Sequence, residues 1–206
     1  ELPGAKEFVE QAKALCTVSI AHTDCTYDHA KVAVDAGVTH LTHLYNAMPG
    51  IHHRNPGVIP AAVEKGNVRA EIICDGYHIH AASVRLAFTM FGGDRMVLIS
   101  DSGRCEGLPE GSKFELGGQD AWLKDGVARL GDGTIACSAT NLFDCMRNAI
   151  SFGVKEEDTL LLAQHDTRLV QNTVIQTDVL TERSAHIRND PMCNEHTRNV
   201  RSADGT

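Results

Sequence analysis

Three side chains in this sequence have the types and spacing needed to activate a water molecule. His22 follows a short apolar run, His43 ends the next apolar run, and Asp101 follows a later one. Neutral imidazoles bind divalent metal ions, and a nearby carboxylate can take a proton from metal-bound water and return it to a leaving amine. The pattern favours His22 and His43 as metal ligands and Asp101 as the catalytic acid/base. From spacing alone, two unrelated histidines and an ordinary loop aspartate remain an open alternative.

Two further histidines are candidates for the same site. His78 follows a third apolar run and is expected in the same layer, although a solvated loop histidine is the alternative. His40 stands three residues before His43, so in a regular strand it points to the opposite face. His40 is therefore the weaker ligand candidate.

Polar groups in the loops could contact a substrate. Arg54 lies in a loop flanked by Pro and Gly, and its forked guanidinium suits phosphate or carboxylate, with a solvated loop as the alternative. Asn46 follows the second apolar run and could form a hydrogen bond with a substrate. The segment 133–138 precedes a helical pattern, so its backbone N–H groups could face an anion or a sugar oxygen.

The elements that must position these residues alternate between strands and helices. The strands are apolar on both faces, which is typical of parallel sheets covered by helices, in a (β/α) barrel or an open doubly wound sheet. The carboxyl ends of parallel strands share one face, where active sites are built. Strands are expected at 16–20, 38–44, 69–74 and 95–100, and helices at 5–15, 27–36, 59–65 and 81–91.

The pattern changes after residue 112. Residues 113–136 alternate between apolar and polar positions around Asp-Gly turns, which predicts β-hairpins. A helix is expected at about 138–152, and another opens at Glu156. We expect a domain over 1–160 with a hairpin insertion at about 113–136. Residues 161–206 have few apolar positions, so they are expected to form an atypical, poorly ordered tail with a weak strand at 170–179.

Composition narrows the range of partners. The net charge of -8 argues against binding to a nucleic-acid backbone, and no apolar run is long enough to cross a membrane. We expect no signal peptide, because no basic start precedes an apolar run. The seven cysteines are scattered and odd in number, which fits reduced thiols and a cytoplasmic location.

Six short segments form a recognisable series. They are A-H-T at 21–23, T-H-L-Y-N-A-M at 42–48, H-R-N-P-G at 53–57, D-G-Y-H at 75–78, S-D-S at 100–102 and G-T-I-A-C-S at 133–138. In order and spacing this series resembles the N-acetylglucosamine-6-phosphate deacetylase family of the amidohydrolase superfamily. The resemblance covers about residues 1–160 and implies an α/β fold, the C-terminal half of a TIM-like (β/α) barrel with a small β-hairpin insertion.

The resemblance also implies an activity. That family hydrolyses the acetamide of N-acetylglucosamine 6-phosphate to glucosamine 6-phosphate and acetate. A divalent metal is implied, with Zn first and Fe, Co or Mn as alternatives, and so is a homodimer in which Arg54 binds the phosphate across the interface. His22 and His43 resemble metal ligands and Asp101 the acid/base. The substrate-binding residues implied by the resemblance are Asn46, Ala47, Arg54, His78, Ile135, Ala136 and Cys137.

The sequence departs from the family pattern in three places. The third metal ligand of the family is a Glu in an H-L-E-G-P segment, which does not occur in this sequence. Ala21 and Cys137 stand where the family usually has Gly, and the Cys137 side chain could crowd the sugar loop. We therefore expect a fragment. The alternatives are a degenerate or truncated non-catalytic homologue, or a deacetylase of another N-acyl sugar.

Overall fold

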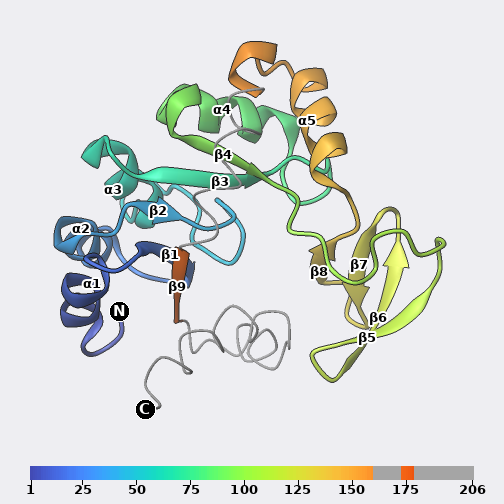
Figure 1. Ribbon diagram of the computed structural model, residues 1–206, viewed down its shortest axis with the longest axis horizontal. Helices are drawn as coiled ribbons and strands as arrows, with labels where there is room; N and C mark the ends of the chain where they lie inside the picture. Colours follow the sequence, from blue (N-terminus) through green and yellow to red (C-terminus); the bar gives the residue numbers. More distant parts are fainter. Residues whose placement is uncertain (160–172, 179–206) are drawn as a thin grey trace.

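A five-stranded parallel sheet forms the body of the protein in the computed structural model, which describes residues 1–159 and 173–178 (Figure 1). The strand order is β4-β3-β2-β1-β9, so four of the strands lie beside their neighbours in the sequence. Every pair in this sheet is parallel. The strands are β1 (Thr17–Thr23), β2 (His40–Leu41), β3 (Arg69–Ile73), β4 (Met96–Ile99) and β9 (Thr173–Asp178).

Helices connect the strands and cover one side of the sheet (Figure 1). The residues at the helix ends explain where the helices begin and end. The Thr26 hydroxyl and the Asn141 amide oxygen accept hydrogen bonds at the starts of two helices, while Gly37, Gly66 and Gly92 follow the ends of three. The helices are α1 (Ala5–Ala12), α2 (Tyr27–Ala36), α3 (Val58–Lys65), α4 (Ala81–Phe91), the 3-10 turn η1 (Gly93–Arg95) and α5 (Leu142–Ser151).

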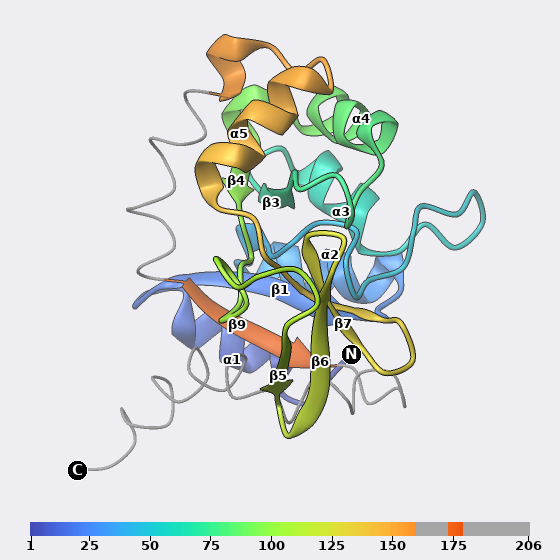
Figure 2. The same cartoon turned by 90° about the vertical axis from the view of Figure 1, so that its right-hand side faces the viewer.

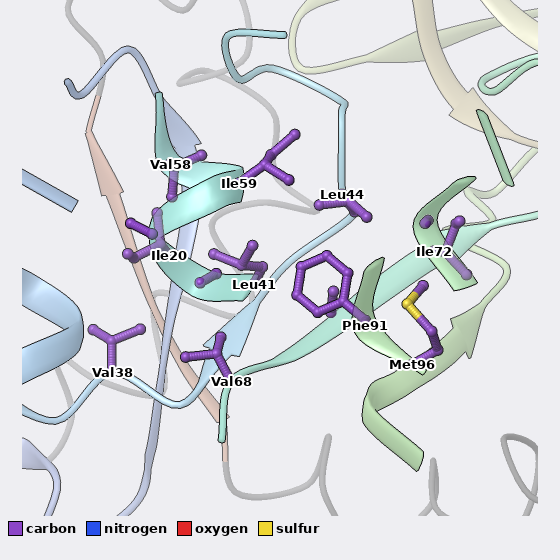
Figure 3. Close-up of a cluster of buried hydrophobic side chains, with 14 of the residues drawn as sticks. Ile20, Val38, Leu41, Leu44, Val58, Ile59, Val68, Ile72, Phe91 and Met96 are labelled. Carbon is purple, nitrogen blue, oxygen red and sulfur yellow. The ribbon is translucent and has the colours of Figure 1, made fainter. Parts of the chain in front are cut away.

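The main hydrophobic core lies between the sheet and these helices (Figure 3). Leu41 of β2 and Ile72 of β3 are fully buried and belong to the same cluster as Ile59 of α3 and Phe91 of α4. Burial of this apolar surface holds the strands in place, and it therefore fixes where the strands end.

A second, antiparallel sheet lies to one side of the parallel sheet (Figure 1). It has its own small core, to which Leu116, Ala121 and Ala128 contribute together with Cys105 and Cys137. Its last strand meets the chain that leaves β4, through a bridge between Ser102 and Ser138. The strands are β5 (Lys113–Leu116), β6 (Gln119–Lys124), β7 (Val127–Leu130) and β8 (Ile135–Ser138).

Some predicted boundaries were wrong. The strand predicted at 38–44 is only His40–Leu41, because positive φ angles at His43 and Tyr45 turn the chain out of the sheet. The helix predicted at about 138–152 begins at Leu142, since Ser138 ends β8. The first helix ends at Ala12, before the predicted residue 15.

The segment 161–206 is described only in β9. The weak strand predicted at 170–179 is confirmed over Thr173–Asp178, which pairs with β1 (Figure 2). The rest of the expected tail lies outside the described residues. Within the described part of the chain, no helix is long and apolar enough to span a bilayer.

Candidate metal and catalytic site

The two predicted metal ligands are in contact. The His22 and His43 ring centroids are 4.7 Å apart, with the rings edge to face. They come from the carboxyl ends of β1 and β2, neighbouring parallel strands. Burial, and to a smaller extent the nearby His43, lower the pKa of His22 to about 4. His22 is therefore neutral at physiological pH, as a metal-binding imidazole must be.

Backbone conformation marks the same positions. The φ angles of His22, His43 and Asp101 are 46°, 34° and 48°, in the left-handed region that side chains other than Gly rarely adopt. At His22 the pairing of β1 with β9 slips by one residue, which is the geometry of a β-bulge. A bulge redirects a side chain, and such strain persists where the surrounding structure enforces it. All three predicted metal and catalytic residues thus share one unusual local geometry.

A buried carboxylate supports His43 from the neighbouring strand. Glu71 of β3 is 6% exposed, and its Oε2 accepts a hydrogen bond from the His43 backbone N–H at 3.3 Å. Its Oε1 accepts a hydrogen bond from His40 Nε2 at 3.1 Å. The side chain of His40, the weaker ligand candidate, is therefore committed to Glu71, and together the two residues position His43.

A third strand end carries a second carboxylate–histidine pair. Asp75 follows β3, and its Oδ2 lies 2.6 Å from His78 Nδ1 while its Oδ1 accepts the N–H groups of Tyr77 and His78. Burial acts to raise the pKa of Asp75, but the hydrogen bonds from His78 and Tyr77 outweigh it, and the pKa is lowered. Asp75 is therefore ionised and fixes the His78 ring, which leaves Nε2 of His78 for a substrate group.

Asp101 is exposed at the end of β4 and is tied to the second sheet. Its carbonyl oxygen accepts a hydrogen bond from the Ser138 N–H at 3.0 Å. The Ser138 carbonyl in turn accepts the Gly103 N–H at 3.0 Å. Ser138 directly follows the predicted sugar-binding residues 135–137, so the structure joins that strand to the segment that carries Asp101.

The remaining predicted residues lie in the loop between β2 and α3. The Asn46 amide donates to the carbonyl oxygens of His43 and Leu44, so its Oδ1 atom faces away from these bonds. Ala47 is exposed with a φ of 49°. Arg54 is exposed and contacts His53 of its own loop, which projects from the body (Figure 2). The structure brings Asn46 into contact with the backbone of His43 but shows no contact between Arg54 and either predicted metal ligand.

The histidine pair fits two positions of a metal site. The two rings are in contact, His22 is neutral, and His43 Nδ1 is buried without a hydrogen-bond partner among the described residues. A buried ring nitrogen without a partner is costly unless something binds nearby. Over residues 1–159 and 173–178, no group of three or more His, Cys, Asp or Glu side chains is arranged to hold a metal. The described residues therefore offer two candidate ligands, fewer than a protein metal site needs.

Sequence reasoning missed three residues that organise this site. Glu71 was detectable as a lone carboxylate among the apolar residues of its strand, since such a group needs a buried partner. Asp75 could have been found from its place three residues before His78. Ser138 carries no comparable signal, because its role depends on backbone bonds between segments far apart in the sequence.

Comparison with known proteins identifies relatives of this chain. No protein-family profile matches the chain. The chain is 40% identical over 134 residues to an N-acetylglucosamine-6-phosphate deacetylase of Bacillus subtilis, covering 65% of this chain and 34% of that protein. It is 32% identical over 130 residues to a putative N-acetylgalactosamine-6-phosphate deacetylase of Escherichia coli, covering 62% of this chain and 77% of the relative. The chain spans about a third of the length of the first curated relatives it matches.

A solved structure has the same arrangement of elements. It is an aspartate-to-alanine mutant of the N-acetyl-D-glucosamine-6-phosphate deacetylase of Mycobacterium smegmatis in complex with N-acetyl-D-glucosamine-6-phosphate. The TM-score is 0.73 at 36% identity, over 79% of this chain and 43% of that one. Fold and site thus define an α/β protein with its polar groups at the carboxyl ends of parallel strands. Within that class, the chain belongs to the N-acetylglucosamine-6-phosphate deacetylase family.

Proposed function

We propose that this chain carries the catalytic residues of a hydrolase that converts N-acetylglucosamine 6-phosphate to glucosamine 6-phosphate and acetate. The observation that carries the proposal is the contact of His22 with His43 at adjacent strand ends, with Asp101 in the same strained geometry two strands away. Relatives named for this substrate are 37–40% identical, which favours it over a non-catalytic homologue or a deacetylase of another sugar.

We propose His22 and His43 as the ligands of a divalent metal, with Zn first and Fe, Co or Mn as alternatives. When bound, such a metal supplies a water of lowered pKa and polarises the acetyl carbonyl. The two imidazoles suit Zn²⁺, Fe²⁺ and Co²⁺ alike, because nitrogen ligands of this kind bind all of them. Glu71 and His40 hold the His43 backbone in the conformation that directs its ring toward His22.

Asp101 would transfer a proton from the attacking water to the leaving amine. Its carboxylate accepts a proton from the attacking water and then donates it to the nitrogen of the departing amine. Exposure of Asp101 is compatible with this role, since the group must meet both water and substrate. The hydrogen bond from the Ser138 N–H to the Asp101 backbone carbonyl keeps Asp101 beside β8, the strand that would cover the sugar.

Substrate contacts complete the proposal. His78, fixed by Asp75, orients a polar group of the substrate, and Arg54 binds the phosphate in a charge-assisted hydrogen bond. Asn46 Oδ1 accepts a hydrogen bond from a sugar hydroxyl. Ala47 and the backbone at Ile135, Ala136 and Cys137 line the sugar site.

We propose a (β/α) barrel, a homodimer and a cytoplasmic location for the protein in which these residues act. The strand order β4-β3-β2-β1 supports the barrel, because each strand lies beside its sequence neighbour without the switch point of a doubly wound sheet. The exposed loop of Arg54 supports the dimer, since over residues 1–159 and 173–178 the hydrogen bond of its guanidinium stays within its own loop.

Metal titration and a substrate panel test the proposal together. The protein in which these residues act is stripped with a chelator, titrated with Zn²⁺ and assayed for acetate release from N-acetylglucosamine 6-phosphate, its galactose isomer and unphosphorylated N-acetylglucosamine. We expect metal-dependent release, greatest with the first substrate. His22→Ala and His43→Ala should lose metal, while His29→Ala, on the exposed side of α2, should retain it. Equal metal binding in all variants would overturn the ligand assignment.

A further inference from the structure

Two cysteines outside the histidine pair face each other across the junction of the two sheets. Cys105 Sγ and Cys137 Sγ are 3.8 Å apart, from positions 32 residues apart in the sequence. Cys105 is 0% exposed and Cys137 is 9% exposed. They meet because Cys137 lies on β8 and Cys105 lies in the turn that follows Asp101.

The backbone around this thiol pair is held on both sides. Ser138 donates to the Asp101 carbonyl and accepts from Gly103, each at 3.0 Å, and Cys105 Sγ donates to the Ser138 carbonyl at 3.5 Å. Gly103 leaves the necessary room, because a Cβ atom there would lie only 2.3 Å from Cys137 Sγ. The contact between the sulfurs is therefore built into the packing of the two segments.

Cys105 also differs in ionisation from other buried cysteines. The hydrogen bond with Cys137 lowers the pKa of Cys105 to about 7, whereas burial raises the pKa of Cys145 to about 11 and raises that of Cys74. The thiolate is the reactive form of cysteine. One thiolate beside a second sulfur is the arrangement from which a disulfide forms.

We propose that Cys105 and Cys137 are a redox modification site, a dithiol that a peroxide converts reversibly to an intramolecular disulfide. One thiolate attacks a peroxide oxygen and becomes a sulfenic acid as hydroxide leaves; the second sulfur then displaces that hydroxyl as water. Two thiols and hydrogen peroxide yield one disulfide and two waters, with two electrons passing to the peroxide. The sulfurs need to approach by only about 1.8 Å to reach bonding distance.

The bond would connect the segment that carries Asp101 to the strand proposed to cover the sugar. The disulfide would restrict the movement of these two segments relative to each other and so regulate turnover, a consequence that rests on the proposed deacetylase function. The existence of the disulfide does not depend on that function, so its test reads the covalent bond rather than turnover.

Peptide mapping of the oxidised chain is the test. The reduced full chain is treated with equimolar hydrogen peroxide, blocked with N-ethylmaleimide and digested without reductant. We expect a linked peptide pair containing Cys105 and Cys137, lighter by two hydrogens than the separate peptides, which dithiothreitol separates. Cys105→Ser and Cys137→Ser should each abolish it. Cys74→Ser is the matched control, because it changes a thiol that interacts with Cys145 instead, and it should leave the link intact.

A comparison of disulfide formation in folded and urea-unfolded wild-type chains tests the proposal even if a variant fails to fold. Linkage in the folded wild-type chain should exceed that in the unfolded chain on the order of tenfold, because the fold holds the sulfurs together. Equal linkage in both states overturns the proposal. So does recovery of Cys105 and Cys137 as separate maleimide adducts or sulfinic acids in the folded chain.

Discussion

Removing the Glu71 carboxylate should both destabilise the fold and weaken metal binding. Glu71 accepts hydrogen bonds from the His40 ring and from the His43 backbone N–H, and it is 6% exposed. In Glu71→Ala both donors remain buried without an acceptor. The variant thus tests whether the Glu71 carboxylate stabilises both the fold around the end of β2 and the proposed metal ligand His43.

The magnitude follows from the two lost bonds. A buried donor left without an acceptor costs about 1–3 kcal/mol, so two of them lower the free energy of unfolding by about 2–6 kcal/mol. Glu71→Gln retains one oxygen and should lose roughly half of that. Groups that orient a metal-binding histidine typically contribute about tenfold to hundredfold in metal affinity. We expect Zn²⁺ affinity to fall by that factor in Glu71→Ala.

Two assays measure these effects separately. Urea unfolding in the presence of a chelator reports the stability of the metal-free chain, and competition with a chromophoric chelator reports Zn²⁺ affinity. Glu156→Ala is the control, because Glu156 is an exposed glutamate for which a change within about 0.5 kcal/mol is expected. If Glu71→Ala matched Glu156→Ala in stability and bound Zn²⁺ like the wild type, the positioning role of Glu71 would be refuted.

Three further predictions concern single groups. The pKa of Asp75 is lowered in the folded state, so its stabilising effect is present above the ordinary carboxyl pKa and is lost as the pH falls through the folded value. Asp75→Asn should therefore flatten the loss of stability below about pH 4, measured by urea unfolding across pH. An unchanged dependence of stability on pH in this acidic range contradicts this. Thiolate absorbance of Cys105 should appear with a midpoint near its pKa of about 7 and move upward in Cys137→Ala; an unmoved midpoint excludes the shared hydrogen bond. Arg54→Ala should raise KM for the phosphorylated sugar by roughly tenfold to hundredfold and leave the unphosphorylated sugar unaffected, with Arg54→Lys between them; equal changes for both sugars refute phosphate binding by Arg54.

The sequence predicted three of the strands because they depend on local pattern. Apolar runs that end in polar residues gave the bounds of β3 and β4 to within one residue, but the predicted end of β1 was three residues too early, so His22 lies inside β1 rather than after it. β2 was overestimated, since V-T-H-L-T-H-L alternates like a strand but leaves the sheet after Leu41. Propensity could not reveal that departure, because the turn at His43 includes a hydrogen bond from its N–H to Glu71 on another strand.

The parts of the site that escaped prediction depend on contacts across the chain. Cys137 was noted only as a residue that could crowd the sugar loop, yet its sulfur lies against Cys105 in the small core of the second sheet. The join between Ser138 and Asp101 likewise needs the register of β8. Neither spacing nor periodicity encodes such a register, because it is set when the two sheets pack.

Acetate release by the Zn²⁺-loaded chain, wild type against Asp101→Asn, tests the central claim most directly. The substitution preserves size and removes the proton-accepting carboxylate. We predict that the variant binds Zn²⁺ as the wild type does, while acetate release from N-acetylglucosamine 6-phosphate falls by about a hundredfold or more. Release at the wild-type rate by Asp101→Asn would contradict the assignment of Asp101 as the acid/base.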